Sequence, residues 1–217
     1  MKNLSRHLKK YKLNDNSIIF DVGTHKGEYL KFFLKLNNKF TIFAFEPQKN
    51  IFEDLKKKYQ DKTNINLNNI GLGEKKENLE MKINIKSSTS TFSKINLSSN
   101  YFKLKSKLLG KNLDEIFYRN EIIPIETIDN IFLNKNLDKI DLVKIDVLGF
   151  EYKVLKGAKK TLPKIKLILL EFHNHDMYPE YNLVETHEFL TKNNFSLSKT
   201  FKFPFMNWED RLYVNNL

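Results

Sequence analysis

The chain has 217 residues, and its 37 lysine and arginine residues against 26 aspartate and glutamate residues give a formal net charge of +11. With 41% hydrophobic and 13% aromatic residues it can bury the core of one domain, which excludes an intrinsically disordered chain. The absence of cysteine excludes disulfide scaffolds, thiolate metal sites and every mechanism with a cysteine nucleophile.

Residues 1–16 predict a short leading helix, because Leu4, Leu8 and Tyr11 recur at intervals that place them on one helical face. This start is polar and rich in lysine, without the apolar stretch of a signal peptide. No apolar run in the chain approaches the roughly 18 residues of a membrane-spanning helix. We therefore expect a cytoplasmic protein without a transmembrane segment.

Residues 17–85 alternate between apolar and amphipathic runs, as in parallel sheets that are covered by helices. Strands are predicted at 17–22, 40–45, 65–70 and 79–85, and helices at 29–36 and 48–59. The last of these strands alternates apolar and polar residues, which indicates one solvated face.

Residues 86–120 interrupt the alternation. Positions 87–99 are rich in serine, threonine and asparagine, and positions 101–109 form an amphipathic segment with several lysines. Long irregular segments in compact domains are commonly lids or binding loops, so we expect an insertion that covers the acceptor of a reaction. The alternative is a surface loop without a role.

Residues 121–217 resume the alternation. Helices are predicted at 127–133, 151–161 and 184–193, and strands at 140–147 and 165–172, with 195–200 and 212–215 as a closing antiparallel pair. The chain is therefore expected to form a single α/β domain with a doubly wound, mostly parallel sheet of about seven strands. Residues 17–85 form its cofactor-binding half and residues 121–217 its acceptor-side half.

Polar residues gather at the predicted carboxyl ends of the strands, where doubly wound sheets bind ligands. The first strand runs into DVGTHKG at 21–27, a glycine turn before a helix that lets a ligand approach the backbone. Its spacing is neither that of a dinucleotide-binding turn nor that of a phosphate-binding loop. An acid before the first glycine repels a pyrophosphate but suits a cationic ligand.

Glu46 follows the second strand, where an acid can accept hydrogen bonds from both hydroxyls of a ribose. Together, Asp21 and Glu46 describe a site for a nucleoside that carries a positive group and no phosphate, as S-adenosylmethionine does. The alternative for Glu46 is a structural role before Pro47 at the start of the next helix.

The segments DVGTHKGEY, FAFEP, NNIGLG, IETID, KIDVLGFEYKVLKGA and LLEFH, in this order, resemble the FkbM-type family of class I S-adenosylmethionine-dependent methyltransferases. The resemblance covers about residues 17–175. It implies a Rossmann-like seven-stranded methyltransferase fold, S-adenosylmethionine as methyl donor with S-adenosylhomocysteine as product, and O-methylation of a sugar or other secondary-metabolite hydroxyl. The chain departs from the family at Leu148, where an acid is usual, but retains Gly149 and Glu151.

The resemblance also implies the members of the cofactor site. They are Asp21, Gly23 and Gly27 at the methionine end, Glu46 at the ribose, Asn69 with Ile70 at the adenine edge and Asp146 beside the methyl group, with Thr24, His25 and Pro47 in the same site.

Methyl transfer to an alcohol requires a closely placed acceptor and a general base that removes the hydroxyl proton. The candidates are Asp146, Glu171 and His173, with His175 as a further histidine nearby. Residues 171, 173 and 175 alternate along an extended segment and can share one side. A metal site built from them with Asp146 or Asp176 is the less favoured alternative, so we expect no metal.

Lys144 is unusual inside a parallel strand, and we expect a structural ion pair with Glu151 or Asp141. The aromatic residues of the tail are Phe201, Phe203, Phe205 and Trp208. Core packing or a subunit contact is the favoured interpretation of this group, and a platform for stacking a sugar is the alternative.

The positive charge is carried mostly by lysines along the whole chain, with arginine only at Arg6, Arg119 and Arg211. This favours a solvated surface over a nucleic-acid partner, and the missing cysteine and Pro-Pro motif argue against base methylation. The expected partner is a small-molecule or glycan acceptor. Peripheral contact with an anionic surface, an oligomer, and a degenerate cofactor-binding domain that serves in assembly stay open.

Overall fold

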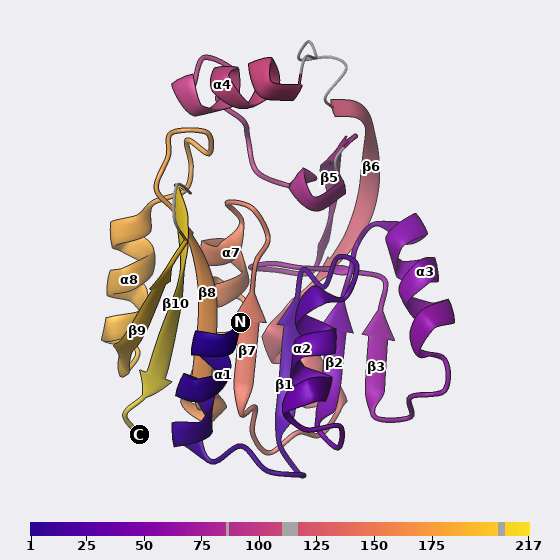
Figure 1. Cartoon of the computed structure of the whole chain (residues 1–217), viewed down its shortest axis with the longest axis vertical. Helices are drawn as coiled ribbons and strands as arrows, with labels where there is room; N and C mark the ends of the chain where they lie inside the picture. The colour runs from indigo at the N-terminus through magenta and orange to yellow at the C-terminus, as the bar shows by residue number, and fades with distance from the viewer. Residues whose placement is uncertain (86, 110–116, 204–206) are drawn as a thin grey trace.

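The computed structural model describes residues 1–85, 87–109, 117–203 and 207–217. A seven-stranded sheet crosses the centre of the molecule (Figure 1). Its strands are β1 (Ile18–Val22), β2 (Thr41–Phe45), β3 (Ile65–Asn68), β7 (Leu142–Ile145), β8 (Leu167–His173), β9 (Phe195–Lys202) and β10 (Trp208–Asn215).

The strand order is β3-β2-β1-β7-β8-β10-β9. The first five of these strands pair in parallel, and β10 runs antiparallel to both of its neighbours. This confirms the doubly wound, mostly parallel sheet with a closing antiparallel pair. Chain order reverses at β1, which lies between β2 and β7, so the carboxyl end of β1 is the switch point where such sheets bind ligands.

Helices cover both faces of this sheet, which explains why its central strands are mostly apolar. One face carries α1 (Lys2–Leu8) with the 3-10 turn η1 (Lys9–Tyr11), α2 (Glu28–Leu36) and α3 (Lys49–Tyr59). The other face carries α6 (Ile128–Asn134), α7 (Glu151–Lys156) and α8 (Leu183–Lys192). The helix predicted at 151–161 is shorter than expected. It ends at its C-cap Gly157, and the chain continues as a turn into η3 (Leu162–Lys164).

A second, three-stranded sheet stands beside the first, in the order β4-β6-β5 (Figure 1). It consists of β4 (Gly71–Leu72), β5 (Glu77–Asn84) and β6 (Phe117–Glu126), of which only β5 was predicted. Ile123 and Ile125 of β6 pack with Met81 and Ile83 of β5 in a small core of their own.

The chain between β5 and β6 contains η2 (Ser87–Thr89) and α4 (Asn100–Leu109). Figure 1 shows α4 above the ends of the parallel strands. Phe102 of α4 packs with Met177 and Tyr178 from the segment after β8, which holds the helix over the sheet edge. None of the helices that the structure describes has the length and hydropathy that a membrane-crossing segment requires.

Candidate functional site

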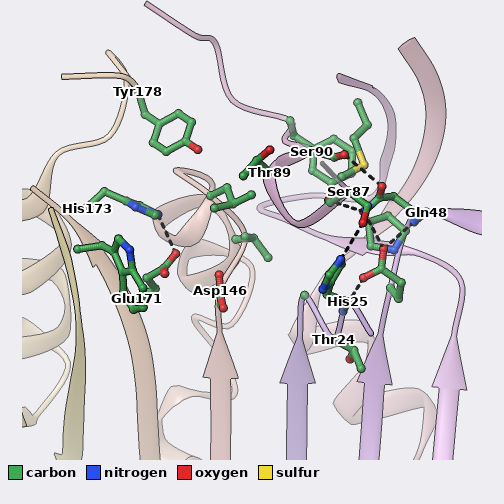
Figure 2. Close-up of a pocket in the computed structure, with 18 of the residues that line it drawn as sticks. Thr24, His25, Gln48, Ser87, Thr89, Ser90, Asp146, Glu171, His173 and Tyr178 are labelled. Carbon is green, nitrogen blue, oxygen red and sulfur yellow. Dashed lines mark hydrogen bonds and ion pairs between the residues drawn. The ribbon is translucent and has the colours of Figure 1, made fainter. Parts of the chain in front are cut away.

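A cavity of about 490 Å³ lies at the carboxyl ends of β1, β2, β7 and β8. Figure 2 shows its two sides, which come from opposite halves of the chain. Thr24, His25, Gln48, Ser87 and Ser90 lie on one side, Glu171, His173 and Tyr178 lie on the other, and Asp146 stands between them at the tip of β7.

The turn after β1 forms the floor between the two sides. Gly23 has a φ of +78°, and a Cβ at this position would lie 2.0 Å from the backbone oxygen of Asp146. Only glycine fits there, because any side chain would push the turn away from the end of β7. Thr24 donates its hydroxyl to the backbone oxygen of Asp21 at 2.9 Å, which keeps the turn closed.

Glu46 is buried at the end of β2, and both of its carboxylate oxygens face backbone donors. Its Oε2 accepts the N–H of His25 at 2.8 Å, and its Oε1 accepts the N–H of Gln48 at 2.9 Å. Burial raises the pKa of Glu46 to about 7, although the hydrogen bonds from Gln48 and His25 oppose the shift. The side-chain amide of Gln48 makes a third, longer contact to Oε1 at 3.4 Å. A carboxylate has about four lone-pair sites, so Glu46 keeps one for a ligand hydroxyl.

Sequence reasoning missed the residues that cover Glu46. Ser87 is hydrogen-bonded to Nε2 of His25 at 2.9 Å, and the side chain of Gln48 donates to the backbone oxygen of Ser87 at 3.2 Å. The hydroxyl of Ser90 donates to Oε1 of Gln48 at 3.1 Å. The serine-rich composition indicated a binding segment, but only the tertiary fold shows that residues 87–90 lie over the turn after β1.

Four of the predicted cofactor residues do not line the cavity. Asp21 is fully buried below the floor, and Gly27 is buried at the start of α2. Asn69 instead donates its amide to the backbone oxygens of Glu46 and Pro47, at 2.9 and 3.0 Å. Ile70 packs against the core of the main sheet. These four residues support the lining residues from behind.

Lys144 lies buried in the middle of the floor, and the expected partners Glu151 and Asp141 are wrong. Its ammonium lies 3.3 Å from Asp146 and 3.6 Å from Asp21, and it donates to the backbone oxygen of Gly23 at 3.0 Å. Asp21 is the neighbour of Lys144 across the β1–β7 pairing, which explains the partner. Burial would lower the pKa of Lys144, but the surrounding carboxylates raise it overall, so the ammonium stays charged.

The pKa values of Asp146 and Glu171 are shifted in opposite directions. Burial would raise the pKa of Asp146, but Lys144 and a hydrogen bond from Glu171 hold it below its ordinary value. Burial and the neighbouring Asp146 and Glu151 raise the pKa of Glu171 well above its ordinary value. The pKa of Asp146 therefore lies below that of Glu171, so a proton held by the pair resides on Glu171.

His173 stands at the end of β8, behind this pair of carboxyl groups. Its Nε2 lies 3.2 Å from Oε2 of Glu171 and 3.5 Å from Oε1 of Glu151. Neither Nε2 of His173 nor Oε2 of Glu171 has a hydrogen-bond partner among the described residues. These buried atoms are available to a proton that moves during a reaction.

Glu151, Glu171 and His173 also have ligand atoms within 4.8 Å of one another, close enough to share a divalent cation after a small adjustment. Glu151 already accepts the N–H groups of Val147 and Gly149, at 3.0 Å each, and thereby shapes the loop after β7. Two of the other metal candidates lie beside this group: the ring of His175 is 5.2 Å from that of His173, and Asp146 accepts a hydrogen bond from Glu171. His175 stacks on Tyr101 with ring centroids 4.2 Å apart, and Asp176 accepts the hydroxyl of Ser99.

Leu148, which replaces the acid usual in the family, lies in the loop between β7 and α7. It has a φ of +57°, an uncommon conformation for a residue with a side chain. Its backbone oxygen accepts the hydroxyl of Thr91 at 2.7 Å, and its side chain packs beside Tyr178 and Phe102. The cavity therefore has an apolar wall at this position.

Known proteins resemble this chain in sequence and in structure. A family model described as a methyltransferase FkbM domain matches residues 21–197. Among curated proteins, the 2-O-methyltransferase NoeI of Sinorhizobium fredii is 23% identical over 163 residues, which are 74% of this chain and 65% of that protein. The chain thus spans somewhat less than two thirds of the length of this relative.

Solved structures of low sequence identity share the fold. A putative rRNA-methylase from Clostridium thermocellum has a TM-score of 0.55 at 10% identity, covering 98% of this chain and 93% of that chain. TrmK of M. capricolum, solved in complex with S-adenosylhomocysteine, has a TM-score of 0.50 at 15% identity and covers 98% and 67% of the two chains.

Proposed function

The chain belongs to the FkbM family of S-adenosylmethionine-dependent methyltransferases, and from this premise we propose that it transfers a methyl group to a hydroxyl oxygen of a saccharide or glycoconjugate. The proposal rests on one observation, that residues suited to two tasks line the same cavity. Glu46 is an acid placed to bind a ribose, and Asp146 with Glu171 and His173 can accept a proton. The name of the relative, a 2-O-methyltransferase, supports oxygen as the methylated atom.

The residues on the Glu46 side fit the cofactor. S-adenosylmethionine supplies an activated methyl group on a positively charged sulfonium. Glu46 has a lone-pair site left for a ribose hydroxyl, and the turn at Thr24 and His25 with the cover formed by Gln48 and Ser87 encloses the same end of the cavity. The ionised Asp146 supplies a negative charge at the centre, which suits a cationic ligand.

The residues on the other side handle the proton of the acceptor. Asp146 is the accessible member of the group, because 34% of its side chain is exposed, against 10% for Glu171 and 3% for His173. Asp146 accepts the hydrogen bond of the acceptor hydroxyl and takes its proton as the carbon–oxygen bond forms. Asp146 can pass this proton to Glu171 while Glu171 gives one to Nε2 of His173, and loss of that proton to solvent returns Asp146 to its ionised form for the next turnover.

The test begins with calorimetric titration of S-adenosylhomocysteine, with NAD as the control ligand, and continues with a methyl-transfer assay on a panel of saccharides. In Asp146→Asn we expect turnover to fall by about 10² to 10³ while S-adenosylhomocysteine binds within a factor of about three of the wild type. His173→Ala should show the same split with a smaller loss. Asp54→Asn, an exposed carboxyl group on α3, is the matched control.

Full activity of both Asp146→Asn and His173→Ala would reject these catalytic roles. Tight S-adenosylhomocysteine binding without transfer to any saccharide would instead identify a cofactor-binding domain that works in an assembly. The solved neighbours named as RNA methylases resemble this chain in fold alone, so RNA serves as one further acceptor in the panel.

A further inference from the structure

A second hollow, of about 910 Å³, opens between α1 and the β9–β10 edge of the main sheet. We propose that it binds the phosphate group of a soluble phosphorylated saccharide, whose sugar hydroxyl then reaches Asp146. We call the hollow the basic groove, after the five cationic side chains that line it. They are Lys2, Arg6, Lys10, Lys199 and Lys202.

The cations come from two elements that are fixed to each other. Lys2, Arg6 and Lys10 recur every four residues along α1 and η1, so they share one side of these helical turns. Lys199 and Lys202 belong to β9. His7 and Tyr11 both hydrogen-bond to the hydroxyl of Ser198, which docks α1 and η1 on β9 and keeps the two sources of positive charge together.

None of these five side chains forms an ion pair among the residues that the structure describes, whereas some exposed lysines elsewhere, such as Lys39, Lys94 and Lys192, do. Burial lowers the pKa of His7, and the nearby charges of Lys10 and Lys199 lower it further. The positive charge of these side chains is therefore concentrated and is not paired with a carboxylate. Such a field attracts an anion, and phosphate oxygens accept hydrogen bonds from several cations at once.

The basic groove and the catalytic cavity are continuous. Tyr29, Asp146, Glu171 and Trp208 line both. A ligand in the groove can thus keep its anionic group among the lysines while another part of it lies beside Asp146. The volume of the groove falls in the upper range of ordinary small-ligand sites.

The charge pattern favours a phosphorylated saccharide over a nucleic acid. The inner end of the groove has Asp146, Glu171 and Asp210, which would repel a phosphate backbone that continued inward. A neutral sugar has no such penalty there, and Phe203 and Trp208, whose ring centroids are 4.2 Å apart, offer it an aromatic wall. Arg6 is the only arginine among the residues that line the groove.

The sugar part of this inference rests on the proposed function, whereas binding of the phosphate group depends on the groove alone. The experiment tests these two parts separately. The full chain is titrated calorimetrically with inorganic pyrophosphate, UDP-glucose and glucose, each with and without S-adenosylhomocysteine. Two triple variants remove the same charge from different places. Lys10→Gln/Lys199→Gln/Lys202→Gln alters the groove, and Lys56→Gln/Lys57→Gln/Lys159→Gln alters exposed lysines outside it.

We expect pyrophosphate and UDP-glucose to bind the wild type and the control variant equally, and to bind the groove variant about tenfold more weakly. Glucose alone should bind much more weakly than UDP-glucose. We expect S-adenosylhomocysteine to bind the wild type, the groove variant and the control variant equally. If S-adenosylhomocysteine does not bind but the phosphate probes do, the proposed function is rejected and the proposal for the groove stands.

Equal weakening in both variants, or no binding of either phosphate probe, would overturn the proposal. So would a clear preference for a 12-nucleotide single-stranded RNA or for vesicles of phosphatidylglycerol over UDP-glucose, because either result would assign the groove to a macromolecular or membrane partner.

Discussion

Glu46 combines a deeply buried position with a carboxyl group that changes charge near neutral pH. The pKa is about 7 because burial disfavours the ionised form. The ionised form is the one that accepts hydrogen bonds from a ribose, so the cofactor site should depend on pH in a range where exposed carboxyl groups do not titrate.

We expect S-adenosylhomocysteine to bind about tenfold more weakly at pH 6 than at pH 8, since the ionised fraction of a group with a pKa near 7 falls by about this factor. Glu46→Gln should bind weakly at both pH values, without the step. His25→Gln should retain the step, because burial lowers the pKa of His25, away from that of Glu46. A step that survives in Glu46→Gln would assign the pH dependence to another group. Calorimetry at the two pH values measures all three proteins.

Helix α4 is the element most loosely joined to the rest of the molecule. Phe102 is 2% exposed, but it packs in a small cluster with Met177 and Tyr178 that is separate from the two cores of the main sheet. Small satellite clusters open at lower cost than a main core. The helix can therefore leave the site while the sheet stays folded.

In Phe102→Ala we expect the opening free energy of α4 to fall by about 3 kcal/mol, because a buried aromatic ring is lost. Amide exchange in 100–109 and trypsin cleavage at Lys103 should accelerate strongly, with little change in the thermal midpoint of the whole chain. Leu104→Ala on the same helix is the control, since Leu104 is 57% exposed. A matching fall in the thermal midpoint would show that α4 unfolds only with the core.

The parallel core could be predicted from the sequence because most of its strands are apolar runs bounded by glycine or polar residues. Strand β6 could not, since its buried residues Ile123 and Ile125 alternate around Pro124, which weakens a strand signal. Its partner β5 lies about forty residues earlier, and β4 has only two residues, too few for any periodicity. Strand pairing that spans such distances leaves no local pattern.

The same limit applies to the site. Glu46, Asp146, Glu171 and His173 could be found because each follows or ends a predictable strand, and the structure brings them to one cavity. Gln48 and Ser87 could not, because their place depends on how the segment after β5 folds back. The partners of Lys144 also required knowing that β1 and β7 are neighbours.

At the scale of the whole molecule, the helix layer of the main sheet meets the second sheet at a backbone contact. A Cβ at Gly157, directly after α7, would lie 1.9 Å from the backbone oxygen of Gly73, directly after β4. No side chain separates the end of α7 from the second sheet at this point. We therefore expect the two sheets to unfold together.

In Gly157→Ala we expect a loss of about 3 kcal/mol in unfolding free energy, because the backbones must separate to admit the methyl group. Fluorescence of Trp208 in the main sheet and far-ultraviolet circular dichroism should report one shared transition at lower denaturant concentration. Lys159→Ala, an exposed neighbour, should stay within about 0.5 kcal/mol of the wild type. Two separate transitions in the wild type would contradict the coupling of the sheets.

The buried contact between Lys144 and Asp21 joins strands that lie far apart in the chain, and this has a consequence for folding. In the native register of β1 and β7, Lys144 stands opposite Asp21. A slip by one residue would set Lys144 opposite Phe20 or Val22 and leave Asp21 buried without its ammonium, at a cost of several kcal/mol. The ion pair therefore selects the native register of β1 and β7, because only correctly aligned halves of the chain can close the sheet.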